Sequence, residues 1–118
     1  STFGGNPLAC AVALEALAVL DDEQLIARAA ESGEWLGAQL ATLDHPAIVA
    51  VRGRGLIWAI ELREAARPWA EALQRRGVLC KETHGTVLRL SPPLATSRED
   101  LAFLVKQLQQ VFEQHQAE

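Results

Sequence analysis

The sequence predicts an α+β domain in which helices pack mainly on one face of a small, mostly antiparallel sheet of about four strands. Long segments near both ends of the chain carry apolar residues at three-to-four-residue spacing, a pattern typical of amphipathic helices. Short runs rich in Val, Ile and Leu occupy the middle of the chain and are typical of strands. The connections between some of these runs are too short for helical crossovers, so at least one antiparallel hairpin is expected.

The composition limits the size of the domain and its partners. The chain has 118 residues, 49% of them apolar, which suffices for one domain and is too few for two. Its formal net charge of −4 argues against a nucleic-acid or anionic-membrane surface. No signal peptide is visible, and the longest apolar run is shorter than the about 20 helical residues that span a bilayer. Cys10 and Cys80 lack metal-ligand spacing, so we expect two reduced, buried thiols, no metal and a cytoplasmic location.

The first segment combines a polar loop, residues 1–6, with an apolar helix, residues 7–20. Asn6 is a favoured N-cap, and the proline after it is a favoured first helical residue. The hydroxyls of Ser1 and Thr2 precede two glycines, and such a loop before a helix N-terminus can bind an anion. An ordinary capped helix start is the commoner interpretation. The helix is apolar all round, so another domain or subunit is expected to cover it.

The remaining elements are expected as helices at about 22–43, 66–76 and 97–115, and as strands at 48–52, 56–62, 78–81 and 86–90. Acidic residues suit the first turn of the helix that starts near residue 22. Gly33 on its apolar stripe either allows close packing or weakens the helix. Gly77 sits where the C-terminal glycine of a helix belongs. Thr96 and Glu99 are predicted to form a capping box for the last helix.

Arg89 is the binding residue to which the sequence itself points. It alternates with Leu88 and Leu90, which take the opposite face of the strand, whereas Val87 shares its side. A solvated arginine is the commoner case, and a two-pronged carboxylate clamp, which the rigid guanidinium suits, is the alternative. Hydrolase and zinc chemistry find no support, because the histidines accompany neither a GxSxG elbow nor metal-ligand spacing.

Four segments resemble, in order, the C-terminal part of class III (subgroup II, fold type I) pyridoxal-phosphate-dependent aminotransferases. They are STFGGNPLAC at 1–10, RGRGL at 52–56, RGVL at 76–79 and VLRLSPPL at 87–94. The segment KETHG at 81–85 is similar to a loop of the ornithine enzymes, which typically carries proline where Glu82 stands here. Within the family, the chain is therefore most similar to ornithine and acetylornithine aminotransferases.

The resemblance implies a division into two parts and a set of site residues. Residues 1–21 would form the loop for the cofactor phosphate and a helix between domains and subunits, and residues 22–118 the small C-terminal domain. Ser1 and Thr2 would bind the phosphate of pyridoxal 5′-phosphate in the neighbouring subunit of a homodimer. Arg89 would bind a carboxylate of the amino donor or of the 2-oxo acid. The large domain of the same chain would be a further partner.

The resemblance also places the catalytic machinery outside this sequence. The Schiff-base lysine and the aspartate that holds the pyridinium nitrogen protonated would lie upstream of Ser1. No catalytic residue is therefore expected here, and the chain alone is expected to be inactive and its first loop mobile or displaced. The complete enzyme would transfer the terminal amino group of ornithine or acetylornithine to 2-oxoglutarate. A 4-aminobutyrate or diamine aminotransferase, or a non-catalytic α+β interaction domain, is the alternative.

Overall fold

A computed structural model of the chain describes residues 1–115, and within them it contains four helices and four strands. In chain order these elements are α1 (Pro7–Asp22), α2 (Leu25–Leu40), β1 (Ile48–Arg54), β2 (Ile57–Leu62), α3 (Arg67–Arg75), β3 (Lys81–Thr83), β4 (Val87–Leu90) and α4 (Arg98–His115). The four strands form one sheet in the order β1-β2-β4-β3, and every neighbouring pair is antiparallel. The predicted α+β class and antiparallel sheet are confirmed.

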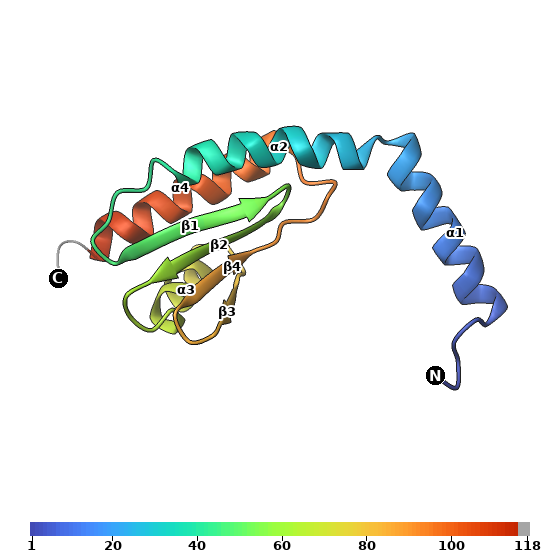
Figure 1. Cartoon of the computed structure of the whole chain (residues 1–118), viewed down its shortest axis with the longest axis horizontal. Helices are drawn as coiled ribbons and strands as arrows, with labels where there is room; N and C mark the ends of the chain where they lie inside the picture. The colour runs from blue at the N-terminus through green and yellow to red at the C-terminus, as the bar shows by residue number, and fades with distance from the viewer. Residues whose placement is uncertain (116–118) are drawn as a thin grey trace.

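The sheet has one covered and one uncovered face. Helices α2, α3 and α4 pack against the covered face, and the opposite face is open (Figure 1). The core between sheet and helices contains Leu36, Leu40, Ile60, Leu62, Trp69, Leu73, Leu88, Leu90, Leu101, Leu108 and Phe112. The predicted apolar face of α4 is buried except for Leu104, which is half-buried, and Phe103 lies off this face, 48% exposed.

Two left-handed turns set the strand pairing. The β1–β2 hairpin turns at Gly55, whose φ is +55°, and its strands pair from Arg54 opposite Ile57 onward. The β3–β4 hairpin turns through His84 and Gly85, with φ of +51° and +76°. Positive φ is readily adopted by glycine and is uncommon for other residues, so these turns fix which residues face each other across the sheet.

Gly33 packs tightly against the β1–β2 turn. A Cβ on Gly33 would lie 2.5 Å from the carbonyl carbon of Gly55 and 2.6 Å from its Cα. Real Cβ atoms do not approach backbone this closely, so only glycine allows α2 to lie here. The close-packing interpretation of Gly33 is thus confirmed.

Helix α2 begins later than predicted. Asp21 and Asp22 belong to the end of α1, and Gln24 precedes α2 in the left-handed conformation, with φ of +51°. The Gln24 N–H donates to the carbonyl of Asp21, which closes the end of α1. The prediction of acidic residues in the first turn of α2 is therefore wrong, because one left-handed residue moves both helix boundaries.

Strand β3 is also shorter and later than the predicted 78–81. Gly77, with φ of +82°, ends α3, and the N–H groups of Gly77 and Val78 donate back to the carbonyls of Gln74 and Leu73. This is the Schellman arrangement, and it confirms Gly77 as the residue after the helix end. Val78 thereby belongs to the helix terminus and is buried, so the strand starts only at Lys81.

The cap of α4 and one cysteine differ from expectation. Ser97, not Thr96, caps α4, because its Oγ accepts the Asp100 N–H at 3.1 Å. Thr96 instead donates its N–H to a proline carbonyl in the preceding turn. Cys10 is exposed on α1, so the prediction of burial is wrong for this residue, and Cys80 is half-buried; both are free thiols.

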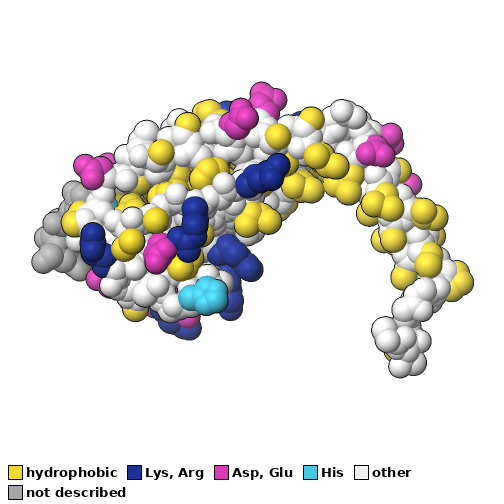
Figure 2. Space-filling view, viewed as in Figure 1, with side chains coloured by type: hydrophobic (Ala, Val, Ile, Leu, Met, Phe, Trp, Pro, Cys, Tyr) yellow, Lys and Arg dark blue, Asp and Glu magenta, His cyan; other side chains and the backbone are white. Residues whose placement is uncertain are grey.

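Helix α1 projects away from the rest of the structure (Figure 1). No residue of α1 is buried, and four of its large apolar side chains, those of Leu8, Val12, Leu14 and Leu17, are between 61% and 77% exposed. Its apolar side chains are prominent in Figure 2. Among residues 1–115, no helix combines the length and the apolar character needed to cross a membrane.

Candidate functional site

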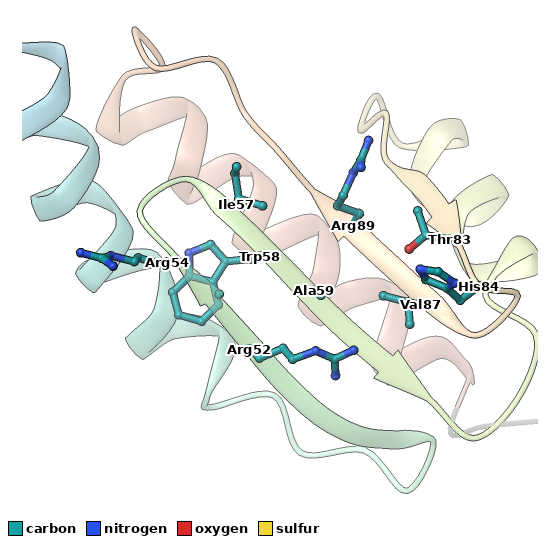
Figure 3. Close-up of a pocket in the computed structure, with 10 residues that line it drawn as sticks. Arg52, Arg54, Ile57, Trp58, Ala59, Thr83, His84, Val87 and Arg89 are labelled. Atoms are coloured by element: carbon teal, nitrogen blue, oxygen red, sulfur yellow. The ribbon is translucent and has the colours of Figure 1, made fainter.

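The open face of the sheet carries a broad hollow. Its volume is about 710 Å³, and its lining comes from all four strands and from the β3–β4 turn. The lining residues are Arg52, Gly53, Arg54, Ile57, Trp58, Ala59, Thr83, His84, Val87 and Arg89 (Figure 3). Three of them are arginines, so a hollow with apolar walls is flanked by cationic groups.

Arg89 lies on this face as the alternation of strand residues predicts. Leu88 and Leu90 are buried in the core, Arg89 is exposed, and Val87 lines the same hollow as Arg89. Ala59 lies directly opposite Arg89 on β2. Its small side chain leaves space beside the guanidinium. Within residues 1–115 the Arg89 guanidinium has no hydrogen bond and no ion pair, so its five N–H donors are available to a bound carboxylate.

The other two arginines of the hollow are placed differently. Arg52 on β1 forms an ion pair with Glu61 on β2, so its charge is already balanced. Arg54 extends from the end of β1 toward α2 and away from Arg89 (Figure 3). Of the three guanidinium groups, that of Arg89 is therefore the best candidate for a ligand that enters the hollow.

Trp58 forms a rigid wall at one end of the hollow. Its Nε1 donates to the carbonyl of Gly55 at 2.8 Å, which fixes the ring. The ring fills space that a side chain at Gly37 or Gly53 would occupy; a Cβ on Gly53 would lie 2.6 Å from the Trp58 Cε3. Sequence reasoning did not identify this wall, because it depends on contacts with Gly37 of α2 and Gly53 of β1 that leave no signal around residue 58.

The loop that carries Ser1 and Thr2 is held by its own asparagine. The Asn6 Oδ1 accepts the Ala9 N–H at 2.9 Å, and the Asn6 Nδ2 donates to the Phe3 carbonyl at 2.8 Å. Asn6 is thus the predicted N-cap of α1. Both hydroxyl side chains are exposed and, among the described residues, make no hydrogen bond, so they fit a role as phosphate donors.

The structure does not bring this loop together with Arg89. The N-terminus lies beyond the far end of α1, on the other side of the bend between α1 and α2 (Figure 1). The two candidate anion-binding elements of one chain therefore do not form a single site. Two hydroxyls also supply only part of what a phosphate group needs, because a phosphate has several acceptor oxygens.

Two side chains outside the hollow have shifted pKa values. Burial raises the pKa of the Cys80 thiol, which keeps it protonated and weakens it as a nucleophile. The hydrogen bond that Arg67 donates to the Glu71 carboxylate and the nearby charge of Glu82 raise the pKa of Arg67, whose exposed guanidinium contacts both carboxylates. In the part of the chain that the structure describes, no group of three or more His, Cys, Asp or Glu residues is placed to hold a metal ion.

The sequence model of one protein family, described as aminotransferase class-III, matches residues 1–112. The chain belongs to the class-III aminotransferase family. Over 113 residues it is 56% identical to ornithine aminotransferase 2 of Staphylococcus saprophyticus, and over 111 residues it is 53% identical to ornithine aminotransferase of Bacillus subtilis. These matches cover 96% and 94% of the chain but 28% of each relative, so the chain spans about a quarter of the length of these relatives.

Solved structures of class-III aminotransferases share the fold. Acetylornithine aminotransferase from Elizabethkingia anophelis superposes with a TM-score of 0.90 at 40% identity, covering 97% of this chain and 32% of that one. Ornithine aminotransferase from Toxoplasma gondii, in a structure described with partial occupancy of PLP at its active site, superposes with a TM-score of 0.92 at 38% identity. That match covers 100% of this chain and 30% of the other. The cofactor of the family is thus pyridoxal phosphate, as the sequence predicts.

Proposed function

We propose that this chain is the C-terminal part of an aminotransferase that transfers the terminal amino group of ornithine or acetylornithine to 2-oxoglutarate. The proposal rests on Arg89. Its guanidinium is exposed, has no partner among residues 1–115, and lies on the open face of the sheet beside an apolar hollow. The names of the relatives at 53–56% identity support an ornithine-type substrate. Both amino donors and the 2-oxo acid carry the carboxylate that such a guanidinium binds.

Arg89 would bind and orient the substrate. Two parallel N–H···O hydrogen bonds to one carboxylate fix both the position and the rotation of the ligand, which lysine cannot do. The walls formed by Trp58 and Ile57 would exclude water from one side of the bound carboxylate and so strengthen the interaction. A substrate held in this way presents its reacting end at a defined distance from the arginine.

Pyridoxal phosphate supplies an electron sink for the reaction when it is bound. Ser1 and Thr2 would each donate a hydroxyl hydrogen bond to its phosphate, and the separation of their loop from Arg89 supports a site in the neighbouring subunit of a homodimer. The lysine that carries the cofactor and the aspartate beside its ring nitrogen would belong to the preceding large domain. This chain alone would then hold no cofactor and catalyse no transamination.

Helix α1 would be the surface that this large domain and the second subunit cover. An isolated helix with exposed Leu8, Leu14 and Leu17 leaves apolar area in water, which association would remove. Residues 1–21 would accordingly act as the part between domains and subunits, and residues 22–118 as the small domain. Two free thiols are consistent with a reducing, cytoplasmic location.

A panel of amino donors tests the substrate of the full-length enzyme. Ornithine, acetylornithine, 4-aminobutyrate and a diamine are compared by kcat/KM with 2-oxoglutarate as acceptor. The proposal expects ornithine or acetylornithine to be preferred over the other two. A clear preference for 4-aminobutyrate or the diamine would replace the substrate assignment, and the absence of turnover with all four would favour a non-catalytic interaction domain.

Replacing Thr2 by valine tests the phosphate contact. The substitution removes one hydroxyl and keeps the shape of the side chain, so cofactor dissociation from the full-length enzyme is expected to accelerate. A hydrogen bond to a charged group contributes about 1.5–3 kcal/mol, which predicts an increase of about 10- to 100-fold in the cofactor Kd. An unchanged Kd in the Thr2→Val variant would remove this residue from the phosphate site.

A further inference from the structure

One row of residues crosses the open face of all four strands. Arg52 on β1 lies opposite Ala59 on β2, Ala59 lies opposite Arg89 on β4, and Arg89 lies opposite Lys81 on β3. Residues directly opposite each other in an antiparallel pair project from the same face, with Cβ atoms about 4.5–5.5 Å apart. Lys81 and Arg89 are therefore immediate neighbours. They also line a shared pocket of about 240 Å³ at the edge of the sheet.

No carboxylate of the described residues balances this pair of cations. Glu61 lies two residues after Ala59 on the same face of β2, and its carboxylate pairs with Arg52. Glu82 follows Lys81 in sequence but lies opposite the buried Leu88, on the other face, where it contacts Arg67 at 3.4 Å. Like charges directly opposite each other destabilise a strand pair. An anion bound between the two cations would reverse the sign of this interaction.

The whole open face is cationic although the chain is acidic. This face carries four cationic side chains and one carboxylate, that of Glu61, so its formal charge is about +3 when the ionised groups are counted. The four cations are Arg52, Arg54, Lys81 and Arg89. The chain as a whole carries −4. Lys and Arg side chains gather around the hollow in Figure 2. A surface of one sign raises the local concentration of ligands of the opposite sign.

We propose that Lys81 is a second carboxylate-binding residue beside Arg89 and that the pair favours the dianionic 2-oxo acid over the amino donor. The inference rests on the proposed function. At neutral pH 2-oxoglutarate carries two negative charges, whereas ornithine has two ammonium groups and one carboxylate and is cationic overall. Lys81 attracts the first and repels the second. Arg89 orients a carboxylate through its planar fork, and Lys81 adds charge without geometric constraint.

The test measures KM for both substrates in the Lys81→Gln variant of the full-length enzyme. Because Lys81 is exposed on an edge strand, this substitution should leave the fold intact. A unit charge about 5 Å from a carboxylate predicts a rise of about tenfold in KM for 2-oxoglutarate at an effective dielectric constant between those of water and the protein surface. KM for ornithine is expected to stay the same or fall. The Lys81→Arg variant, which keeps the charge, should behave like the unsubstituted enzyme.

Lys106→Gln is the matched control. It removes the same charge from the exposed side of α4, behind the covered face of the sheet, and should change neither KM. Added salt should raise KM for 2-oxoglutarate in the unsubstituted enzyme more steeply than in Lys81→Gln. Equal values for Lys81→Gln and Lys106→Gln, or a parallel rise of both KM values, would overturn the inference. Lack of turnover by the unsubstituted enzyme would instead contradict the proposed function.

Discussion

Replacing Arg89 by lysine in the full-length enzyme keeps the positive charge and removes the two-pronged geometry. Arg89 is exposed and has no partner among residues 1–115, so the substitution should change the free energy of unfolding by less than about 0.5 kcal/mol. One charge-assisted hydrogen bond to the substrate carboxylate is lost, at about 1.5–3 kcal/mol. Since 1.4 kcal/mol corresponds to a factor of ten, kcat/KM should fall by about 10- to 100-fold, with cofactor binding retained.

The assay is steady-state transamination with either substrate varied at saturating concentration of the other. Arg52→Lys is the matched control, because it alters an arginine of the same hollow whose charge already pairs with Glu61. Its kcat/KM should remain within about twofold, as expected for an exposed ion pair. Unchanged kinetics of Arg89→Lys with every carboxylate substrate, or an equal loss in Arg52→Lys, would refute the assignment of Arg89 as the carboxylate-binding residue.

Three further predictions concern the chain itself. Gly33→Ala should lower the free energy of unfolding in urea by about 1–3 kcal/mol, because the new Cβ meets the backbone of the β1–β2 turn. Alanine favours a helix over glycine by about 1 kcal/mol, so a stabilisation of that size would contradict the close packing of Gly33. Cys10 should react rapidly with a thiol reagent in the isolated chain and be protected in the full-length enzyme, whereas equal rates in both would show that α1 stays uncovered. Because burial raises the pKa of Cys80, its contribution to stability is present below the ordinary thiol pKa and is lost as pH rises through the raised value; Cys80→Ala should therefore flatten the alkaline fall of stability, and an unchanged slope would exclude this thiol as the cause.

Much of the fold could be predicted from local pattern. The alternation around Arg89 placed Leu88 and Leu90 in the core and Arg89 on the open face, because the period of a strand is two residues. The spacing of apolar residues in α4 likewise identified the buried side of the helix. These predictions succeeded because a single element determines them.

Features that depend on two distant segments could not be predicted. The neighbourhood of Lys81 and Arg89 follows from the register of β3 and β4, which the left-handed His84 and Gly85 fix. The sequence suggested a strand at 78–81, which would have shifted that register, because it did not show that Val78 ends α3. The start of α2 was missed for the same kind of reason, since only the folded chain shows Gln24 in a left-handed conformation.

Parallel transamination assays of the full-length enzyme and of the isolated 118-residue chain show whether this chain acts only as the C-terminal part of an aminotransferase. Both are supplied with pyridoxal phosphate, ornithine and 2-oxoglutarate, and glutamate formation is measured. We predict turnover by the full-length enzyme and none by the isolated chain, because the proposed function gives this chain the carboxylate and phosphate contacts and assigns the lysine that carries the cofactor to the preceding large domain. Turnover by the isolated chain, or failure of the full-length enzyme to use ornithine or acetylornithine, would contradict it.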